Sequence, residues 1–433
     1  MTESFRKPLE AHEVWDFINA LLNWLSHKRH QHFYLLYSGD GHERSPGPHS
    51  YKLLCGISEH GNKCVHFKDV DEFVANRFCF GVLSYDLKNE IEQLHSLNEA
   101  YYDTLDHLLL VPEILIRIDH TGALSISGDD HDVINDTYLE IVGRPHSGLQ
   151  QKVAQRAVVF ESDVSDTEYL ERVARIKSEI IEGNVYELNY CRNYYAKARI
   201  NPFELFKLFT QKNPTPYSAL VKSGDQFVIS GSMERFLCKS KGRLISQPIK
   251  GTAHNSGMNN TAEKERLLSS EKEKAENLMI VDLVRNDLSK SSVTGSVKVD
   301  ELFGVYSYPN VHQMISTVSS QVKPDTPFSQ VIRDAFPMGS MTGTPKLSAM
   351  QLIEELEQFK RGIYSGSIGY IDENGDFDWN VVIRTVIYND ETNTISVPVG
   401  SAITYDSIDT EELNECGVKV EKIMKLIEES VVA

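Results

Sequence analysis

The chain has 433 residues and a mass of 49.0 kDa, and its 44 lysines and arginines against 62 aspartates and glutamates give a formal net charge of −18. A charge of this sign argues against a general nucleic-acid-binding protein, which needs a basic surface. A hydrophobic content of 41% argues against global disorder. Six scattered cysteines without a CxxC pair argue against a zinc ribbon or a disulfide scaffold.

No segment of the sequence has the pattern of a membrane span or an export signal. The apolar runs stay short of the roughly 20 residues that a transmembrane helix needs. The N-terminal segment MTESFRKPLEAHEVW lacks the apolar core of a signal peptide. Together with the composition, these features predict a cytoplasmic protein with reduced cysteines, and its size favours an enzyme.

The most evident boundary along the chain is the stretch 143–151 (GRPHSGLQQ), where turn-forming and polar residues dominate. Mixed strands and short helices are predicted before it, in a region from 1 to 145. A motif-rich region from 160 to 430 follows it. We expect both regions to contribute to one two-lobed unit.

A helix is predicted from Ser165 to Glu182. Ser165 and Glu168 match a capping box. Apolar side chains recur at intervals of four, three and four between Tyr169 and Ile180, which gives one apolar face. Gly183 is expected to end the helix.

Three hairpins are predicted in the second half of the chain. YSALVK turns at Ser223-Gly224 into QFVISGS, and FLCKS turns at Lys241-Gly242 into RLISQPIK. YSGSIGYI reaches Asn374-Gly375, a type I′ turn signal, and continues as one strand, DFDWNVVIRTVIY. Further helices are predicted at about 271–288, 346–360 and 410–428. Hairpins with interspersed helices indicate an α+β fold.

Two pairs of glutamates lie on predicted helices, and the members of each pair are three positions apart: Glu273 with Glu276, and Glu412 with Glu415. Each pair shares a helix face, where like charges destabilise unless a cation compensates them. A solvated acidic face is the structural alternative, and Lys419 would then be an ion-pair partner. Two such pairs in one chain predict a shared site for Mg²⁺, which takes oxygen ligands.

Two cationic residues are candidates for substrate chemistry. Lys250 in QPIKGT ends a predicted strand and precedes Gly251, where a backbone can approach a ligand closely. Desolvation lowers the pKa of a lysine and frees its amine for nucleophilic attack; the alternative is a surface lysine before a turn. Arg384 lies amid apolar neighbours in VVIRTVIY and therefore needs a carboxylate partner, from the protein or from a substrate.

Three further features have a functional and a structural interpretation. In GSMTGTPK (339–346), glycines precede a helix that has Pro345 near its first turn. Such a helix start is either an anion site or only a capped end. His312 and Glu234 each adjoin apolar strand residues, and either residue alone is compatible with a purely structural role.

Ten blocks in order resemble the chorismate-utilising enzymes of the anthranilate synthase component I family. They are GNVYELNY, PTPYSALV, ISGSMERFL, QPIKGT, KEKAENLMIVDLVRNDL, YPNVHQMIST, FPMGSMTGTPKLSAM, RGIYSGSIGY, VVIRT and DSIDTEELNE, within about 165–425. LLYSG and GVLSYDLKNE extend the resemblance into the N-terminal region. The resemblance implies an α+β fold with two lobes of antiparallel β-sheet packed as a sandwich and helices on the outside.

Two residues indicate a branch of the family. Anthranilate, isochorismate and salicylate synthases usually carry alanine at the position of Lys250, and anthranilate synthases commonly carry histidine at that of Asn277. The sequence PIKGT resembles the branch that forms 4-amino-4-deoxychorismate for para-aminobenzoate and folate biosynthesis. An anthranilate synthase component I is the alternative within the family, and a non-catalytic adaptor is the alternative outside it.

The resemblance also implies roles for individual residues. A neutral Lys250 would attack C2 of chorismate, Glu234 would protonate the departing C4 hydroxyl, and His312 would lie near C4. Mg²⁺ would be the cofactor, bound directly or through water by Glu273, Glu276, Glu412 and Glu415. The other substrate contacts would come from Gly251, Thr252, Tyr364, Arg384, Gly400 and Lys419.

The sequence departs from the family pattern at Glu187, where relatives usually carry glutamine or, in the water-using synthases, lysine. It also has Met233 in place of a proline and GSAIT (400–404) in place of a glycine-rich stretch. No cysteine lies in the glycine-rich elbow of an amidotransferase, so the resemblance implies that ammonia comes from a separate glutamine amidotransferase subunit.

Overall fold

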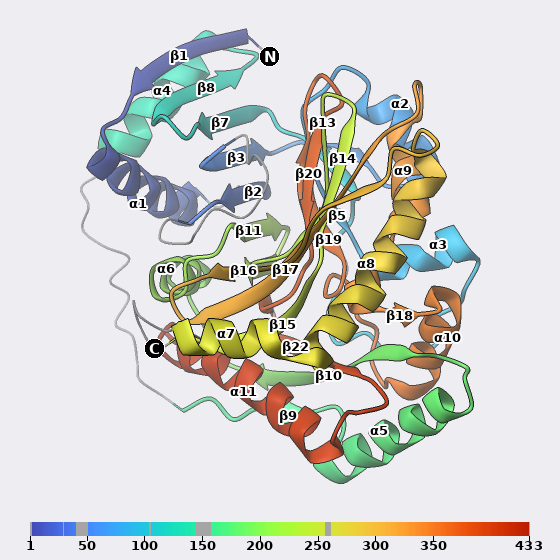
Figure 1. The fold of residues 1–433 in the computed structure, drawn as a ribbon. Coiled ribbons are helices and arrows are strands. Elements are labelled where there is room, and N and C mark those ends of the chain that lie inside the picture. The colour runs from blue at the N-terminus through green and yellow to red at the C-terminus, as the bar shows by residue number, and fades with distance from the viewer. Residues whose placement is uncertain are drawn as a thin grey trace.

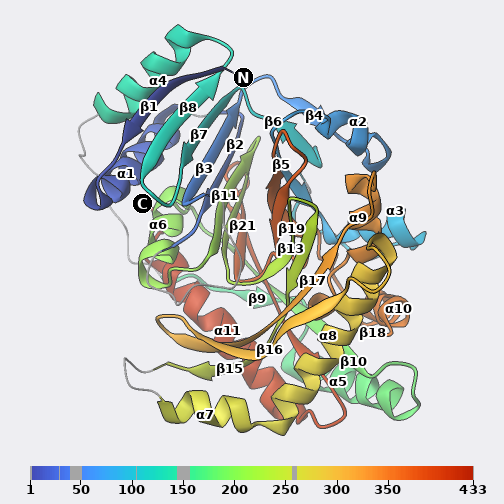
Figure 2. The ribbon, with the colours of Figure 1, turned by 45° about the horizontal axis from the view of Figure 1, so that its top comes forward.

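The structure is a computed structural model that describes residues 2–28, 30–39, 51–103, 105–143, 157–255 and 261–432. Its strands form two large sheets, and strands from the first 130 residues and from the rest of the chain pair within both of them (Figures 1 and 2). Apart from Gly143, the predicted boundary at 143–151 lies outside the described residues. No helix among the described residues combines the length and the apolar character that crossing a bilayer requires.

The larger sheet has twelve antiparallel strands. In spatial order they are β1 (Thr2–Pro8), β8 (Ala123–Gly128), β7 (Ile114–Ile118), β3 (Leu53–Ser58), β2 (His32–Tyr37), β11 (Tyr217–Ser223), β12 (Gln226–Ser232), β21 (Thr385–Asn389), β22 (Thr394–Ile403), β10 (Glu187–Lys197) and β18 (Gly343–Thr344), with β9 (Glu161–Ser162) paired to β10.

The smaller sheet has ten antiparallel strands. In spatial order they are β15 (Ile249–His254), β17 (Val311–Gln321), β14 (Arg243–Gln247), β13 (Arg235–Ser240), β20 (Phe377–Asn380), β19 (Ser367–Ile371), β5 (Cys79–Leu83), β6 (Leu109–Val111) and β4 (Asn62–Cys64), with β16 (Lys298–Ser307) paired to β17.

The helices cover the outer faces of the two sheets (Figure 2). On the larger sheet lie α1 (Ala11–Lys28), α4 (His131–Gly143), α5 (Asp166–Ile181), α6 (Pro202–Lys212), α10 (Lys346–Leu356) and α11 (Asp409–Glu428). On the smaller sheet lie α2 (Val70–Val74), α3 (Lys88–Glu92), α7 (Thr261–Ser269), α8 (Glu271–Ser291) and α9 (Phe328–Ala335).

A core between the sheets joins the two lobes. Tyr34, Ala219 and Val228 of the larger sheet pack in one buried cluster with Phe80 and Ile368 of the smaller sheet. Separate apolar clusters fill the space between each sheet and its helices. This arrangement is a sandwich with helices outside, which confirms the predicted α+β fold.

The predicted helix at 165–182 is confirmed as α5. The Ser165 hydroxyl accepts a hydrogen bond from the backbone N–H of Glu168, and the Glu168 side chain accepts one from the backbone of Ser165, as in a capping box. The helices predicted at 271–288 and 410–428 are confirmed as α8 and α11, and the first two hairpins as β11–β12 and β13–β14. The helix predicted to reach residue 360 ends at Leu356.

The third hairpin differs from its prediction in two respects. A type I′ turn needs positive φ at both central residues, yet Gly375 has a φ of 74° while Asn374 is not among the positive-φ residues. The strand predicted to continue from it is broken, because β20 ends at Asn380 in the smaller sheet and β21 begins at Thr385 in the larger one. Arg384 lies in this crossover, with a φ of 52°.

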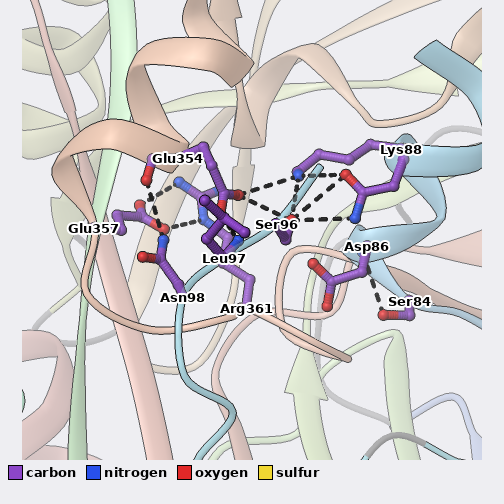
Figure 3. Close-up of polar contacts among 10 residues, drawn as sticks. Ser84, Asp86, Lys88, Ser96, Leu97, Asn98, Glu354, Glu357 and Arg361 are labelled. Atoms are coloured by element: carbon purple, nitrogen blue, oxygen red, sulfur yellow. Dashed lines mark hydrogen bonds and ion pairs between the residues drawn. The ribbon is translucent and has the colours of Figure 1, made fainter. Parts of the chain in front are cut away.

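A buried ion pair supports the strands and loops around this crossover. Arg361 and Glu357 are each 1% exposed, and two guanidinium nitrogens donate to the carboxylate at 2.9 and 2.6 Å (Figure 3). Arg361 also donates to the carbonyls of Asn189 and Met341, at 2.7 and 2.6 Å. One side chain therefore joins β10 to the segment before β18.

Replacing Arg361 with leucine is expected to lower the free energy of unfolding by about 3–5 kcal/mol, because Glu357 would be left as an unpaired buried charge. Urea denaturation followed by circular dichroism measures this change. In the double variant Arg361→Leu/Glu357→Leu, part of the loss should be recovered. An unchanged urea midpoint in the single variant would contradict the role of the pair.

Candidate active site

A cavity of about 450 Å³ lies where the edges of the two sheets meet. Its walls come from β10 and β22 of the larger sheet, β15 and β17 of the smaller sheet, and the helices α8 and α11. Helix α8 packs against β15, and α11 packs against β22 (Figures 1 and 2). The cavity therefore collects side chains that are far apart in the sequence.

Lys250 enters this cavity at a bulge in β15. Ile249 pairs with Ile315 of β17, but the next pair is Thr252 with Gln313, so β15 contains one extra residue. Gly251 in this bulge has a φ of 93°, which favours glycine. A Cβ on Gly251 would lie 3.1 Å from Glu273 Oε2, so the glycine also allows α8 to approach.

The surroundings of Lys250 favour a charged ammonium, whereas its expected role as a nucleophile needs a neutral amine. Its side chain is only 9% exposed, and its Nζ lies 2.5 Å from Oε1 of Glu187, which is fully buried. Burial lowers the pKa of Lys250, but the negative charges of Glu187 and Glu276 raise it by more, so the net shift is upward. Lys250 is therefore an ammonium in the protein without substrate.

Glu234 lies in the same cavity, directly before β13. It is 4% exposed, and burial raises its pKa to about 7, although the charge of Lys250 opposes this shift. A carboxyl group with this pKa is half protonated at neutral pH. It can therefore donate a proton to a leaving group, which is the role predicted for it.

The four glutamates predicted to bind Mg²⁺ line this one cavity from two helices. Glu273 and Glu276 project from α8, and Glu412 and Glu415 from α11. Burial raises the pKa of Glu273 and raises that of Glu276 to about 7. Among the described residues, no three of these carboxylates bring oxygen atoms within 4.8 Å of one another.

The residues around these glutamates test whether a cation fits between the helices. The Nζ of Lys272 lies 3.9 Å from a carboxylate oxygen of Glu276 on α8 and 3.9 Å from one of Glu412 on α11. The Lys272 ammonium thus lies between a glutamate of α8 and a glutamate of α11. Oxygen donors on two facing helices suit Mg²⁺, which keeps several waters and needs few protein ligands.

Arg384 faces the cavity from the sheet crossover. Among the described residues, its guanidinium makes no hydrogen bond or ion pair, and burial lowers its pKa. The sequence allowed two kinds of partner for Arg384, a carboxylate of the protein or one of a substrate. No protein carboxylate pairs with it among the described residues. Tyr364 lines the same wall and is 3% exposed. An arginine with free donors in a cavity is a site for a ligand carboxylate.

Lys419 and Gly400 complete this wall. The Nζ of Lys419 lies 2.5 Å from Glu415 Oε1 and donates to the carbonyl of Gly400 at 2.9 Å. Burial raises the pKa of Glu415, but Lys419 lowers it by more. A Cβ on Gly400 would lie 2.5 Å from Cys191 Sγ, so only glycine fits between β22 and β10 here.

The structure does not place His312 in the cavity. Side chains alternate along β17; Val311 and Gln313 line the cavity, whereas the His312 Nδ1 lies 3.0 Å from the Ser307 hydroxyl of β16. Gln313 accepts a hydrogen bond from Thr252 at 3.0 Å. Gln313, and not His312, therefore lies on the cavity side of β17, which strand alternation relative to Val311 could have indicated.

Helix α10, which begins at the last residue of GSMTGTPK, does not line the cavity. Ser340 and Met341 line the cavity, but no residue of α10 does so. Lys346, the first residue of α10, donates to Asp287 of α8 at 2.6 Å. Two cavity residues that the sequence did not single out are Asn189 and Lys272.

Known proteins resemble this chain along most of its length. The family model for chorismate binding enzymes matches residues 40–425. Aminodeoxychorismate synthase component 1 of Escherichia coli (strain K12) is 31% identical over 350 residues, which cover 80% of this chain and 76% of that protein. Anthranilate synthase component 1 of Aquifex aeolicus (strain VF5) is 31% identical over 368 residues, with 80% and 74% covered.

A solved structure confirms the fold. Anthranilate synthase component I from Streptococcus pneumoniae TIGR4 superposes with a TM-score of 0.76 at 25% sequence identity, over 91% of this chain and 92% of that one. The family resemblance and the fold predicted from the sequence are thus both confirmed. With a family model that matches most of its length, the chain belongs to the chorismate binding enzymes.

Proposed function

We propose that this enzyme is an aminodeoxychorismate synthase component 1, which replaces the C4 hydroxyl of chorismate with an amino group and retains the enolpyruvyl group. The observation that carries the proposal is Lys250, a buried lysine in the cavity that also holds Glu234 and the four glutamates. Relatives of that name, from Escherichia coli and Bacillus subtilis, are 31% and 30% identical to this chain.

In this proposal, Lys250 and Glu234 act on opposite ends of the displacement. The neutral Nζ of Lys250 attacks C2, both ring double bonds shift by one position, and the C4–O bond breaks. Glu234 donates its proton to the departing hydroxyl, which leaves as water. Ammonia then adds at C4 and the C2–N bond to Lys250 breaks. Covalent catalysis divides one difficult displacement into two easier ones.

The two ends of the cavity suit the two carboxylates of chorismate. Arg384, with Tyr364 beside it, is proposed to hold the enolpyruvyl carboxylate, since its guanidinium has no protein partner among the described residues. Gly251, Thr252, Gly400 and Lys419 are proposed to contact the remainder of the substrate. The acidic side of the cavity, which would hold a divalent ion, is proposed to face the ring carboxylate.

The four glutamates Glu273, Glu276, Glu412 and Glu415 would hold Mg²⁺ at that acidic side. When bound, the ion would supply positive charge against the ring carboxylate. The Nζ of Lys272 lies 3.9 Å from an oxygen of each of two of these glutamates, so it would compete with the ion for them. Ammonia is proposed to come from a separate glutamine amidotransferase subunit, as for component 1 enzymes generally.

Product identification tests the proposal. Purified protein is incubated with chorismate, MgCl₂ and an ammonium salt, and the products are separated and weighed by mass spectrometry. A product with –OH replaced by –NH₂ and the enolpyruvyl group intact is expected. Para-aminobenzoate should appear only after a separate lyase is added.

An anthranilate synthase component I is the second candidate. The relative of that kind from Aquifex aeolicus is 31% identical to this chain, the same identity as the relative from Escherichia coli. That enzyme class also eliminates pyruvate. Fluorescent anthranilate in the same incubation, without an added lyase, would reject the first proposal. An absence of any chorismate turnover would favour a protein that only binds.

Replacing Arg384 with leucine is expected to raise the KM for chorismate by roughly 10–100-fold, because one charged hydrogen bond to a carboxylate contributes about 1.5–3 kcal/mol. Arg384→Lys should lie between the two, since lysine keeps the charge but not the paired donors. Initial-rate kinetics measure this change. Unfolding midpoints should stay at the wild-type value, and an unchanged KM would contradict the assignment.

A further inference from the structure

Glu187, the first residue of β10, is the nearest protein group to Lys250 Nζ. Its side chain is fully buried and lies outside the set of residues that line the cavity. One oxygen, Oε1, lies 2.5 Å from Nζ, and the other, Oε2, has no hydrogen-bond partner among the described residues. A buried carboxylate oxygen without a hydrogen-bond partner destabilises the folded protein, so its presence needs an explanation.

A second buried lysine shows what a structural pair looks like in this protein. Lys88 is 1% exposed, and its Nζ donates to Asn89, Ser96 and Glu354 at 3.0, 2.9 and 3.4 Å, so each of its three N–H groups has an acceptor (Figure 3). Among the described residues, Lys250 Nζ has one acceptor, Glu187. Its ammonium group therefore has fewer protein acceptors than that of Lys88.

An ammonium with one short contact to a carboxylate can pass its proton along that contact. Both forms of the pair have zero net charge, so the transfer needs no proton from solvent. The other charged groups that act on Lys250 do so without a hydrogen bond to it. They are Glu234 before β13, Glu273 and Glu276 of α8, and Glu415 of α11.

We propose that Glu187 is the proton acceptor for Lys250 and returns the proton at the end of the cycle, an inference that rests on the proposed function. An N–H bond of the Lys250 ammonium breaks, an O–H bond forms on Glu187 Oε1, and the electron pair remains on Nζ for the attack on C2. When ammonia has added at C4 and the C2–N bond breaks, that pair returns to Nζ. Glu187 then gives back its proton, and the excess proton on the new C4 ammonium restores Glu234.

This role also explains how a buried, protonated lysine can serve as a nucleophile. Glu234 must keep its own proton for the C4 hydroxyl, and Glu276 belongs to the acidic side proposed for the metal. Glu187 is the carboxylate that touches Nζ and has no other task among the described residues.

The test is the rate at which the covalent intermediate forms, before any ammonia is added. Protein is mixed with chorismate and MgCl₂ at pH values from 6 to 9, quenched in acid and weighed intact. Wild-type protein should gain the mass of chorismate less water, at a rate whose pH dependence is that of Glu234 alone, because the Lys250 proton moves within the pair. Glu187→Gln should form the adduct about 100-fold more slowly than wild-type protein at neutral pH, and this ratio should shrink about tenfold for each pH unit above it.

Two further variants separate this role from a structural one. Glu187→Asp keeps a carboxylate and should keep the wild-type shape of the pH profile at a lower rate. Glu354→Gln removes the carboxylate beside Lys88, which does not line the cavity, and should leave that shape unchanged. A Glu187→Gln rate that equals the wild-type rate, or falls by the same factor at every pH, would overturn the inference.

The proposed function and the role of Glu187 can be refuted separately. If wild-type protein forms no adduct and no amino product, the proposed function is wrong and the inference falls with it. If wild-type protein forms both and Glu187→Gln matches it at each pH, only the inference is wrong. A pH-dependent loss in Glu187→Gln, with the profile restored in Glu187→Asp, supports it.

Discussion

Replacing Lys250 with alanine is expected to lower the rate of amination by roughly 10³-fold or more, because the covalent route is lost and only binding and charge stabilisation remain. Any residual product should come from direct attack of ammonia or water at the ring. The measurement is the initial rate of amino product in the presence of chorismate, MgCl₂ and an ammonium salt. Amination at the wild-type rate would refute the covalent role of Lys250.

The single variant needs a matched partner, because it leaves Glu187 buried and unpaired. Such a charge costs about 3–5 kcal/mol of stability, and a partly unfolded protein would also lose activity. The double variant Lys250→Ala/Glu187→Gln removes both charges and should recover the wild-type unfolding midpoint while remaining inactive. Lys88→Ala removes the other buried lysine and should still form the covalent adduct.

Several helices and hairpins of the fold could be predicted from local sequence signals. The capping box at Ser165 and the apolar spacing of α5 are both short-range features, and both are confirmed. The strand that was expected to run through Arg384 was wrong for a reason that is not local. Apolar and β-branched residues continue across the stretch 381–387, so nothing in the pattern marks the point where the chain leaves one sheet for the other.

Most residues of the site could also be predicted from the sequence, but the charge state of Lys250 could not. The resemblance brought Lys250, Glu234, Arg384 and the glutamate pairs together, and the structure places them all in one cavity. The charge of Lys250 depends on Glu187, which is 63 residues away in the sequence. Burial alone lowers the pKa of the amine, and only the fold shows that a carboxylate accompanies it and raises that pKa.

The placement of His312 depends on strand geometry. A histidine attracts a catalytic assignment more readily than a glutamine does, because its ordinary pKa lies near neutrality. The geometry of a strand decides the matter instead, since neighbouring side chains point to opposite faces. Gln313, beside Thr252 and on the same face as Val311, takes the place in the cavity.

Glu234→Gln is the second substitution with a large expected effect, a loss of roughly 10²–10⁴-fold in the rate of adduct formation. Glutamine has nearly the same shape but has no acidic proton for the C4 hydroxyl, so the hydroxyl would have to leave without assistance. Because Glu234 is buried and already half neutral near pH 7, the variant should fold normally.

The pH profile gives this prediction a distinct signature. Burial raises the pKa of Glu234 to about 7, and the acid must hold its proton to act. The wild-type rate, measured at a fixed concentration of free ammonia, should therefore be highest below pH 7 and fall about tenfold for each pH unit above it. Glu234→Gln should lose this basic limb, whereas Glu421→Gln, which removes an exposed carboxylate from α11, should keep it. A basic limb that persists unchanged in Glu234→Gln would assign the proton to another group.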